Sequence, residues 1–257
     1  MKHITSRDNS LFKQLRKLAD SARERRKCGQ VLLDGAHLVE AYAAACGQPE
    51  LLIVAEGDCS PDAVRMLQRM AQVETIMLPP AMLAEISPVT TPTGLLALAA
   101  MPHLALPAAP AFALLIEDIQ DPGNLGSMLR SAAAAGVEAV YLSTGCADIW
   151  SPKTLRGGQG AHFILPVAER ADLVEVATSF AGRTLATALG GTSLYECDLA
   201  GAVAFIIGNE GAGLSASLLA VASERVCIPM PGRVESLNAA AAAAVCLFER
   251  VRRQPVA

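Results

Sequence analysis

Residues 205–215, FIIGNEGAGLS, join a short apolar run to a glycine-rich turn. A second stretch, residues 228–238, reads IPMPGRVESLN and leads directly into a run of alanines. Each has the pattern of a buried strand that ends in a polar turn and is followed by a helix. Ligands of open α/β sheets bind at such strand ends, because the loops there present free backbone N–H and C=O groups. The two turns therefore predict a ligand site in an α/β domain.

A third turn lies earlier in the chain, at residues 117–130, EDIQDPGNLGSMLR. Pro122 and Gly123 form the turn, and Asn124 is a suitable N-cap for the helix that we expect to follow. Arg130 then falls in the second turn of that helix. Taken alone, each of the three turns is explained by an ordinary helix cap or a solvated side chain. Their presence together in one domain favours a single shared site.

Strands and helices alternate along the whole chain, which predicts an α/β fold. The first hundred residues give strands at 31–33, 51–55, 74–78 and 94–100, with helices at 10–27, 36–45, from 61 and at 80–86. Strands are then expected at 112–117, 139–143, 163–167, 184–189, 202–208 and 225–229, with helices at 124–135, from 151, and at 172–181, 215–222 and 236–252. The second half therefore predicts a mostly parallel sheet covered by helices on both faces.

A proline-rich, nearly uncharged segment, residues 101–110, separates the two halves and predicts a linker. We therefore expect a small α/β domain at 1–101, a linker at 102–111 and a second domain at 112–257. Hydrophobic residues make up 52% and charged residues 18% of the chain, as in globular proteins.

The cysteine, histidine and apolar patterns exclude several classes of protein. Seven cysteines without Cys-x-x-Cys spacing and four scattered histidines argue against a disulfide framework or a metal site, and we expect no metal. The start of the chain lacks the apolar stretch of a secretory signal, and no apolar run is long enough to span a bilayer. We therefore expect a cytoplasmic protein.

Positive charge is concentrated at the start of the chain, although the net charge of the chain is −4. Residues 1–33 contain nine Lys or Arg and only three acidic residues. A basic arm on an acidic body is typical of proteins that bind a phosphate backbone, although a solvated helix face would give the same pattern. The residues predicted to bind RNA are Arg7, Lys13, Arg23, Arg25, Arg26 and Lys27.

The commonest α/β signatures are absent from the sequence. The chain has no dinucleotide fingerprint after its first strands, no Walker loop and no G-x-S-x-G elbow. The second domain instead resembles the SpoU family of RNA ribose 2′-O-methyltransferases, within the α/β-knot (SPOUT) superfamily. The matching motifs are residues 121–126 with Arg130, residues 207–214, residues 228–230 with 235–238, and the intervening segments 151–153 and 160–167.

The first domain is similar to the L30e-like substrate-binding domain of the same family. Ser6 with Asn9, Leu32 with Asp34 and Gly35, and Thr91-Pro92 with Gly94 carry this likeness. Two departures are Asp34, where the family often has Glu, and Ala239-Ala240, where it usually has Val and Ser.

The resemblance implies a trefoil-knot methyltransferase domain that binds S-adenosyl-L-methionine and methylates a ribose 2′-hydroxyl without a metal. The residues implied to bind the cofactor are Leu189, Gly190, Gly208, Asn209, Ile228, Met230 and Leu237. The residues implied to be catalytic are Asn124, Arg130, Glu210, Ser236 and Asn238. Because the pKa of an arginine exceeds about 12, we expect Arg130 to position the substrate and stabilise charge rather than to act as a base.

The sequence leaves several readings open. We expect a homodimer and an RNA substrate, and the two-domain layout favours large-subunit (23S) rRNA over tRNA. A tRNA 2′-O-methyltransferase, a non-catalytic RNA-binding or ribosome-assembly protein on the same scaffold, and a small-molecule transferase are the alternatives. Failure to bind S-adenosylmethionine would favour the non-catalytic scaffold, and salt-insensitive substrate binding would favour a small-molecule substrate.

Overall fold

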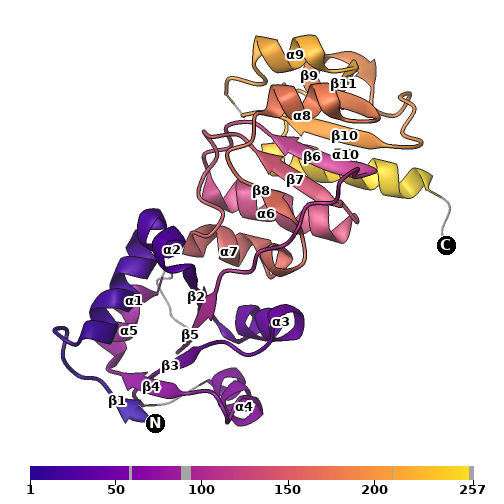
Figure 1. Ribbon diagram of the computed structural model, residues 1–257. Coiled ribbons are helices and arrows are strands. Elements are labelled where there is room, and N and C mark those ends of the chain that lie inside the picture. Colours follow the sequence, from indigo (N-terminus) through magenta and orange to yellow (C-terminus); the bar gives the residue numbers. More distant parts are fainter. Residues whose placement is uncertain (58–59, 88–93, 210, 255–257) are drawn as a thin grey trace. The chain divides into compact units, whose positions relative to one another are not determined.

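The computed structural model describes the whole chain of 257 residues except 58–59, 88–93, 210 and 255–257 (Figure 1). The described residues form two compact units. The first comprises Met1–His103 together with Asp148–Phe163, and the second comprises Leu104–Ala147 together with Ile164–Ala257. Segment 148–163 therefore packs with the first unit, although it lies within the sequence that we predict as the second domain.

The first unit contains a five-stranded mixed sheet in the order β1-β4-β3-β5-β2. Its elements are β1 (Lys2–His3), α1 (Ser10–Asp20), α2 (Ala22–Cys28), β2 (Gln30–Asp34), α3 (Ala36–Cys46), β3 (Leu51–Ala55), α4 (Pro61–Arg69), β4 (Thr75–Leu78), α5 (Pro80–Ile86), β5 (Leu95–Ala100), α7 (Pro152–Gly158) and a 3₁₀ turn at Ala161–Phe163. Strand β5 is antiparallel to both β2 and β3, and the other pairs are parallel. Apolar side chains of α1 and α5 pack on one face of the sheet.

The helix predicted at 10–27 is two helices, because Ser21 breaks it. Ser21 has extended backbone, and its side chain accepts a hydrogen bond from the backbone N–H of Glu24. The sequence signal is the spacing of Ser21 and Glu24, the serine and glutamate of a capping box, at the start of α2. The chain therefore turns at Ser21, and α2 carries its own basic face.

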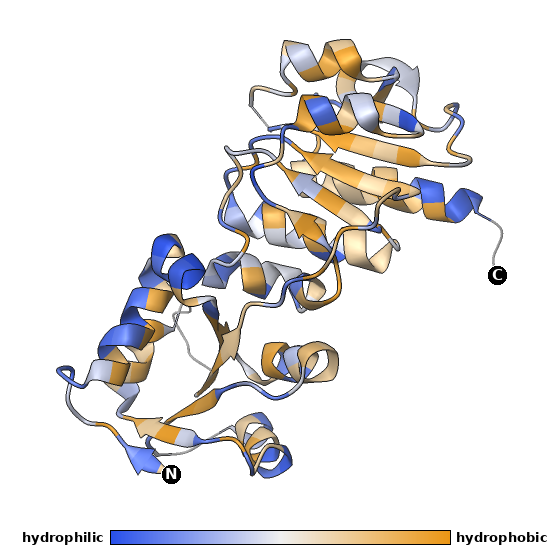
Figure 2. Cartoon of the chain, in the orientation of Figure 1, coloured by the Kyte–Doolittle hydropathy of each residue, from blue (hydrophilic) through white to orange (hydrophobic). Residues whose placement is uncertain are grey.

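The second unit contains a six-stranded, all-parallel sheet in the order β11-β9-β10-β6-β7-β8. Its elements are β6 (Phe112–Ile116), α6 (Pro122–Ala134), β7 (Ala139–Leu142), β8 (Val167–Ala168), α8 (Leu173–Ser179), β9 (Arg183–Ser193), β10 (Val203–Ile207), α9 (Ala216–Val221), β11 (Glu224–Cys227) and α10 (Ala239–Arg253). Every residue of the central strands β6 and β10 is buried, as expected of parallel strands covered on both faces. Figure 2 shows these strands as the most hydrophobic part of the unit.

Helices cover both faces of this sheet, as predicted. Helices α8 and α9 pack on one face, where Ala113, Leu115 and Ile206 meet Leu173 and Leu218. Helices α6 and α10 lie together on the other face (Figure 1), where the guanidinium of Arg250 lies 4.1 Å from the centroid of the Phe112 ring. The carboxyl ends of the parallel strands are thus left for the loops that carry the predicted motifs.

Two further predicted elements are wrong in detail. The strand expected at 163–167 is reduced to Val167–Ala168, because the backbone at Ala161–Phe163 forms a 3₁₀ turn. The last helix begins at Ala239 rather than Ser236, because Asn238 and not Ser236 is its N-cap. No helix in the described part of the chain is long and apolar enough to cross a membrane.

Candidate functional site

A cavity of about 440 Å³ opens beside the middle of β9 and the carboxyl ends of β10 and β11. The loop after β10 and the loop that precedes α10 enclose it. Its lining residues are Thr187, Ala188, Leu189, Ile207, Gly208, Asn209, Gly211, Ala212, Gly213, Val226, Cys227, Ile228, Met230, Glu235, Ser236, Leu237, Ala239 and Ala242. The wall is mostly apolar side chain and loop backbone, which is the composition typical of small-molecule and cofactor sites.

The cavity brings together most of the residues predicted to bind the cofactor. Leu189, Gly208, Asn209, Ile228, Met230 and Leu237 all line it. Gly190 is not among its lining residues, although it belongs to β9. Thr187 was missed by the sequence analysis; it is held in place because its hydroxyl donates a hydrogen bond to the Ile206 carbonyl over 3.0 Å. Its only sequence signal is its place near the end of a predicted strand.

Gly208 is needed because the loop folds back directly onto it. A Cβ at this position would lie 2.5 Å from the Gly213 carbonyl oxygen. Asn209 holds the same loop closed, since its Oδ1 accepts hydrogen bonds from the backbone N–H of Gly211 at 2.8 Å and Ala212 at 3.1 Å. These contacts hold the described residues Gly211, Ala212 and Gly213 close to Gly208 and Asn209 at the cavity wall.

The start of α6 differs from the prediction in one respect. Its N-cap is Asp121, whose carboxylate accepts a hydrogen bond from the backbone N–H of Asn124 over 2.8 Å. Asn124 is thus the third residue of the helix and not its cap. Its side chain is consequently available for a contact outside α6.

That contact is made by Asn238. The Nδ2 of Asn238 donates a hydrogen bond to Oδ1 of Asn124 over 2.9 Å. The Oδ1 of Asn238 caps α10 by accepting from the backbone N–H of Ala240 and Ala241. One side chain therefore ties the start of α10 to the start of α6, and Ser236, two residues earlier, lies in the cavity wall.

Arg130 is exposed on α6 and makes no hydrogen bond or ion pair with the part of the chain that the structure describes. Six residues separate it from Asn124, which in an α-helix corresponds to about 9 Å along the axis and about 120° around it. The two side chains therefore leave α6 on different faces. Glu210, also predicted to be catalytic, lies outside the described residues.

The basic residues of the first unit divide into two groups. Arg25 does not suit the RNA-binding role predicted for it, because it is only 4% exposed and pairs with Asp148 at 2.5 Å. Its guanidinium also donates to the carbonyls of Leu18 and Ala19. Arg7 pairs with Glu85, Lys13 with Asp8, and Arg26 with Asp148.

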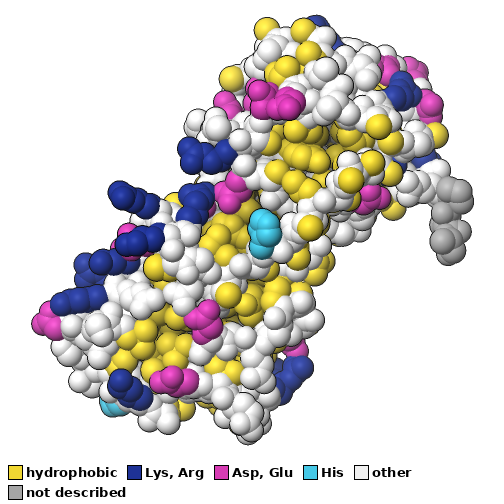
Figure 3. Space-filling model, in the orientation of Figure 1, with side chains coloured by type: hydrophobic (Ala, Val, Ile, Leu, Met, Phe, Trp, Pro, Cys, Tyr) yellow, Lys and Arg dark blue, Asp and Glu magenta, His cyan; other side chains and the backbone are white. Residues whose placement is uncertain are grey.

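Within α1 and α2, the exposed cations with no side-chain partner among the described residues are Arg16, Lys17, Arg23 and Lys27. Of these, the sequence analysis missed Arg16 and Lys17. Figure 3 shows Lys and Arg side chains gathered along the side of the first unit formed by α1 and α2. This surface, defined by the four residues, is called the α1–α2 basic surface below.

Comparison with known proteins identifies the family of this chain. The profile of the SpoU rRNA methylase family matches residues 111–248, and that of the MRM3-like substrate-binding domain matches residues 9–97. The chain belongs to the SpoU rRNA methylase family. Among its relatives is the Bacillus subtilis protein named 23S rRNA (guanosine(2553)-2′-O)-methyltransferase RlmP, 36% identical over 96% of this chain and 98% of the relative.

Solved structures of SpoU methylases have the same fold. A crystal structure of an RNA 2′-O ribose methyltransferase superposes with a TM-score of 0.86 and 32% identity over 98% of both chains. The SpoU methyltransferase AviRb from Streptomyces viridochromogenes, in complex with the cofactor AdoMet, gives a TM-score of 0.83 and 30% identity over 95% of this chain and 98% of that one. These likenesses confirm the predicted fold class, the SPOUT methyltransferase fold.

Proposed function

We propose that this SpoU methylase transfers a methyl group from S-adenosyl-L-methionine to a ribose 2′-hydroxyl of large-subunit (23S) ribosomal RNA. The observation that supports this most strongly is the cavity beside β9 and the carboxyl ends of β10 and β11, which gathers six of the seven residues predicted to bind the cofactor. The names of the relatives support rRNA over tRNA as the substrate, since the name of RlmP describes it as a 23S rRNA methyltransferase.

The residues that line this cavity fit S-adenosylmethionine. Leu189, Ile228 and Leu237 supply apolar surface for a purine face. The backbone of residues 208–209, 211–213 and 228–230 supplies hydrogen-bonding groups for its edge. Gly208 keeps the loop backbone close to the cavity, where any side chain would clash. When bound, the cofactor supplies an activated methyl group on a positively charged sulfur.

The chain's own residues then have to place the ribose hydroxyl in line with that methyl group and accept the charge that develops. We assign Arg130 to the phosphate next to the target ribose, because a guanidinium binds phosphate oxygens in two places at once and stays charged. Asn238 fixes Asn124, and we assign Asn124 and Ser236 to the hydroxyl by hydrogen bonds. As the O–CH₃ bond forms, the S–CH₃ bond would break and its electron pair would go to the sulfur. The 2′-oxygen loses its proton, and we assign its acceptance to Glu210 or to water.

We further propose that the protein acts as a homodimer. Helix α10 exposes Phe248 (45%) and Val251 (36%). An apolar helix face of this kind suits a self-complementary interface between two copies. A cytoplasmic location follows from the proposed substrate. We assign the α1–α2 basic surface to the phosphate backbone of the RNA.

The test of this function is transfer of a labelled methyl group. Purified protein and tritiated S-adenosylmethionine are offered separately to unmodified rRNA and unmodified tRNA. Label in rRNA, recovered after nuclease digestion as an alkali-resistant dinucleotide, is the expected result. Label in tRNA alone would overturn the choice of substrate, and absence of both label and cofactor binding would favour the non-catalytic scaffold.

A further inference from the structure

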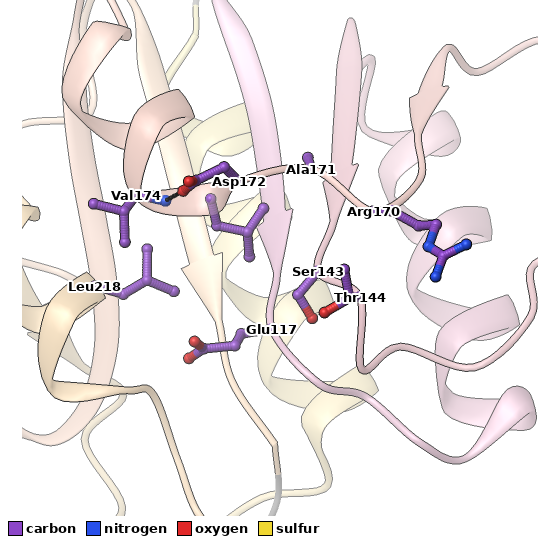
Figure 4. A pocket seen from close by; sticks show the side chains of 9 residues that line it. Glu117, Ser143, Thr144, Arg170, Ala171, Asp172, Val174 and Leu218 are labelled. Carbon is purple, nitrogen blue, oxygen red and sulfur yellow. Dashed lines mark hydrogen bonds between the residues drawn. The ribbon is translucent and has the colours of Figure 1, made fainter.

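A second cavity, of about 350 Å³, lies in the methylase unit at the carboxyl ends of β6 and β7 (Figure 4). Its lining residues are Glu117, Ser143, Thr144, Arg170, Ala171, Asp172, Leu173, Val174 and Leu218. None of these residues lines the cofactor cavity or was predicted as a site residue. We call it the Glu117 cavity.

The chemical groups of the Glu117 cavity change from one side to the other. Figure 4 shows Val174 and Leu218 on one side, above the carboxylate of Glu117, with Ser143 and Thr144 in the middle and Arg170 on the far side. An apolar wall beside a carboxylate suits a heterocycle with a flat face and a hydrogen-bonding edge. The guanidinium of Arg170 points outward on the far side, where it suits a phosphate that extends out of the cavity.

Two polar groups in this cavity have unused hydrogen-bonding capacity. Glu117 Oε2 accepts a hydrogen bond from the backbone N–H of Ser215 over 2.7 Å, whereas its Oε1 has no partner in the part of the chain that the structure describes. The guanidinium of Arg170 likewise contacts no carboxylate of a described residue. Arg170 also has a left-handed backbone, with φ 59°, which is uncommon for a residue other than glycine.

Hydrogen bonds join the Glu117 cavity to the cofactor cavity. Asn209, in the wall of the cofactor cavity, donates from Nδ2 to the carbonyl of Asp118 over 2.9 Å. Asp118 in turn accepts a hydrogen bond at Oδ1 from the Ser143 hydroxyl over 2.6 Å. The loop after β10 is therefore held between the two cavities, and an occupant of one lies close to the wall of the other.

We propose that the Glu117 cavity binds a guanine nucleotide of the RNA substrate other than the nucleotide that is methylated. Guanine presents two adjacent donors, N1–H and the 2-amino group, which match the two oxygens of a carboxylate. In Glu117, Oε1 has no partner among the described residues, and Oε2 has a second lone pair beside the one that the Ser215 N–H uses. Uracil offers one N–H donor that lies between two carbonyl oxygens, and a carboxylate repels these oxygens. Adenine and cytosine each offer only an amino group on this edge. The cavity volume lies in the range of small-ligand sites and accommodates a base with its ribose.

This inference rests on the proposed function for its substrate, but its test is independent of methyl transfer. Guanosine 5′-monophosphate is titrated into the full chain saturated with S-adenosylmethionine, while the methyl resonances of Leu, Val and Ile are followed by NMR. The expected result is a shift of Leu173, Val174 and Leu218, with Ile228 and Leu237 unchanged. Shifts confined to Ile228 and Leu237, or no shift at millimolar nucleotide, would overturn the proposal.

Related nucleotides test the recognition of the guanine edge. Inosine 5′-monophosphate lacks the 2-amino group and should bind about tenfold more weakly, the effect of roughly one hydrogen bond to a charged group. Uridine 5′-monophosphate should bind more weakly still. Equal affinity for all three nucleotides would show that Glu117 does not read the base.

Variants separate the cavity from the fold and from the cofactor site. Glu117→Gln should weaken binding of guanosine 5′-monophosphate at least tenfold, and Val174→Trp should abolish it by filling the apolar side. Arg170→Asn removes the charge but retains a residue that tolerates left-handed backbone. The matched control is Glu175→Gln on α8, an exposed carboxylate outside the cavity.

In the methylation assay, Val174→Trp should raise the KM for RNA while leaving the affinity for S-adenosylmethionine unchanged. If the wild-type protein methylates RNA but none of the cavity variants changes the KM, the inference fails and the proposed function stands. If no RNA is methylated but guanosine 5′-monophosphate still shifts Leu173 and Val174, the proposed reaction fails and the nucleotide site stands.

Discussion

Asn238 donates a hydrogen bond to the side chain of Asn124 over 2.9 Å, across 114 residues of sequence. The same Asn238 side chain caps α10. One residue thus connects a helix start that carries the Arg130 motif with the loop that borders the cofactor cavity. The two roles of Asn238 are separable, because a cap requires only an oxygen, whereas the contact with Asn124 requires the amide N–H.

Substitution at Asn238 should distinguish these roles. Asn238→Ala removes both and should lower the free energy of unfolding by about 1 kcal/mol, the usual contribution of an N-cap. Asn238→Ser keeps a capping oxygen but is too short to reach Asn124, so we expect near-normal stability and reduced methyl transfer. Chemical denaturation and the tritium assay measure the two effects. Full activity in Asn238→Ser would show that the contact with Asn124 has no part in catalysis.

Removal of the Arg130 guanidinium should abolish turnover without affecting the fold. The side chain of Arg130 is exposed and has no partner among the described residues. The free energy of unfolding of Arg130→Ala should therefore lie within about 0.5 kcal/mol of that of the wild type. We expect methylation to fall at least about 100-fold, as for loss of other charge-stabilising groups, while the Kd for S-adenosylmethionine stays unchanged. Arg130→Lys tests whether charge alone suffices, and retained turnover in Arg130→Ala would remove its assigned role.

A side chain at Gly208 should block the cofactor cavity. The Cβ of Gly208→Ala would lie 2.5 Å from the Gly213 carbonyl oxygen, so the loop after β10 must move. Isothermal titration with S-adenosylmethionine should show at least about tenfold weaker binding, and Gly208→Val should bind none. Gly232→Ala is the matched control, because its Cβ would meet nothing within 4 Å. Equal cofactor affinity in Gly208→Ala and Gly232→Ala would contradict this placement of the site.

Two neighbouring arginines of α2 should behave differently when removed. Arg25→Ala removes the buried partner of Asp148, which keeps its exposed partner Arg26, and leaves the carbonyls of Leu18 and Ala19 without that donor. We expect it to destabilise the protein by about 2 kcal/mol, as for loss of hydrogen bonds that involve a charged group. Arg23→Ala, on the α1–α2 basic surface, should leave stability unchanged but weaken RNA binding and reduce its dependence on salt. Denaturation curves measure the stability of both variants, and filter binding at several salt concentrations measures their affinity for RNA. The assignment fails if Arg23→Ala binds RNA as the wild type does.

Stability should fall in mildly acidic solution because of His162. Burial lowers the pKa of His162 to about 4, against an ordinary value of 6.5. The unfolded chain therefore takes up a proton as the pH falls below 6.5, while folded His162 stays neutral until about pH 4. Between pH 7 and pH 5 this should cost about 2 kcal/mol of unfolding free energy. His162→Phe should flatten this part of the pH profile, and an unchanged profile would show that other groups cause the loss.

The sequence predicted the elements with strong local signals and missed those set by distant contacts. Strand 51–55 and the helix beginning at Pro80 were predicted correctly because an apolar run and a helix-starting proline mark them. The two-residue strand β1 was missed, because it is defined by its pairing with β4 rather than by its own composition. The N-caps at Asp121 and Asn238 were misassigned, since several cap-forming residues stand close together there.

The candidate site shows the same division. Residues at predicted strand ends, such as Gly208 and Ile228, lie together in the cofactor cavity because parallel strands present their carboxyl ends at one edge. The burial of Arg25 was not predictable, because its partner Asp148 is 123 residues away. The Glu117 cavity had no sequence signal, as its members come from several separate segments.

The packing of segment 148–163 with Met1–His103 has a consequence for dissecting the protein. Phe163 meets Tyr42 with ring centroids 5.2 Å apart, and Trp150 is buried in the same unit. A fragment cut at residue 112 would carry Trp150 and Phe163 away from their partners, and a fragment ending at residue 101 would lose the cover that they provide. Neither half can be excised by a single cut, so loss of activity on truncation would report damaged folding rather than the role of the missing half.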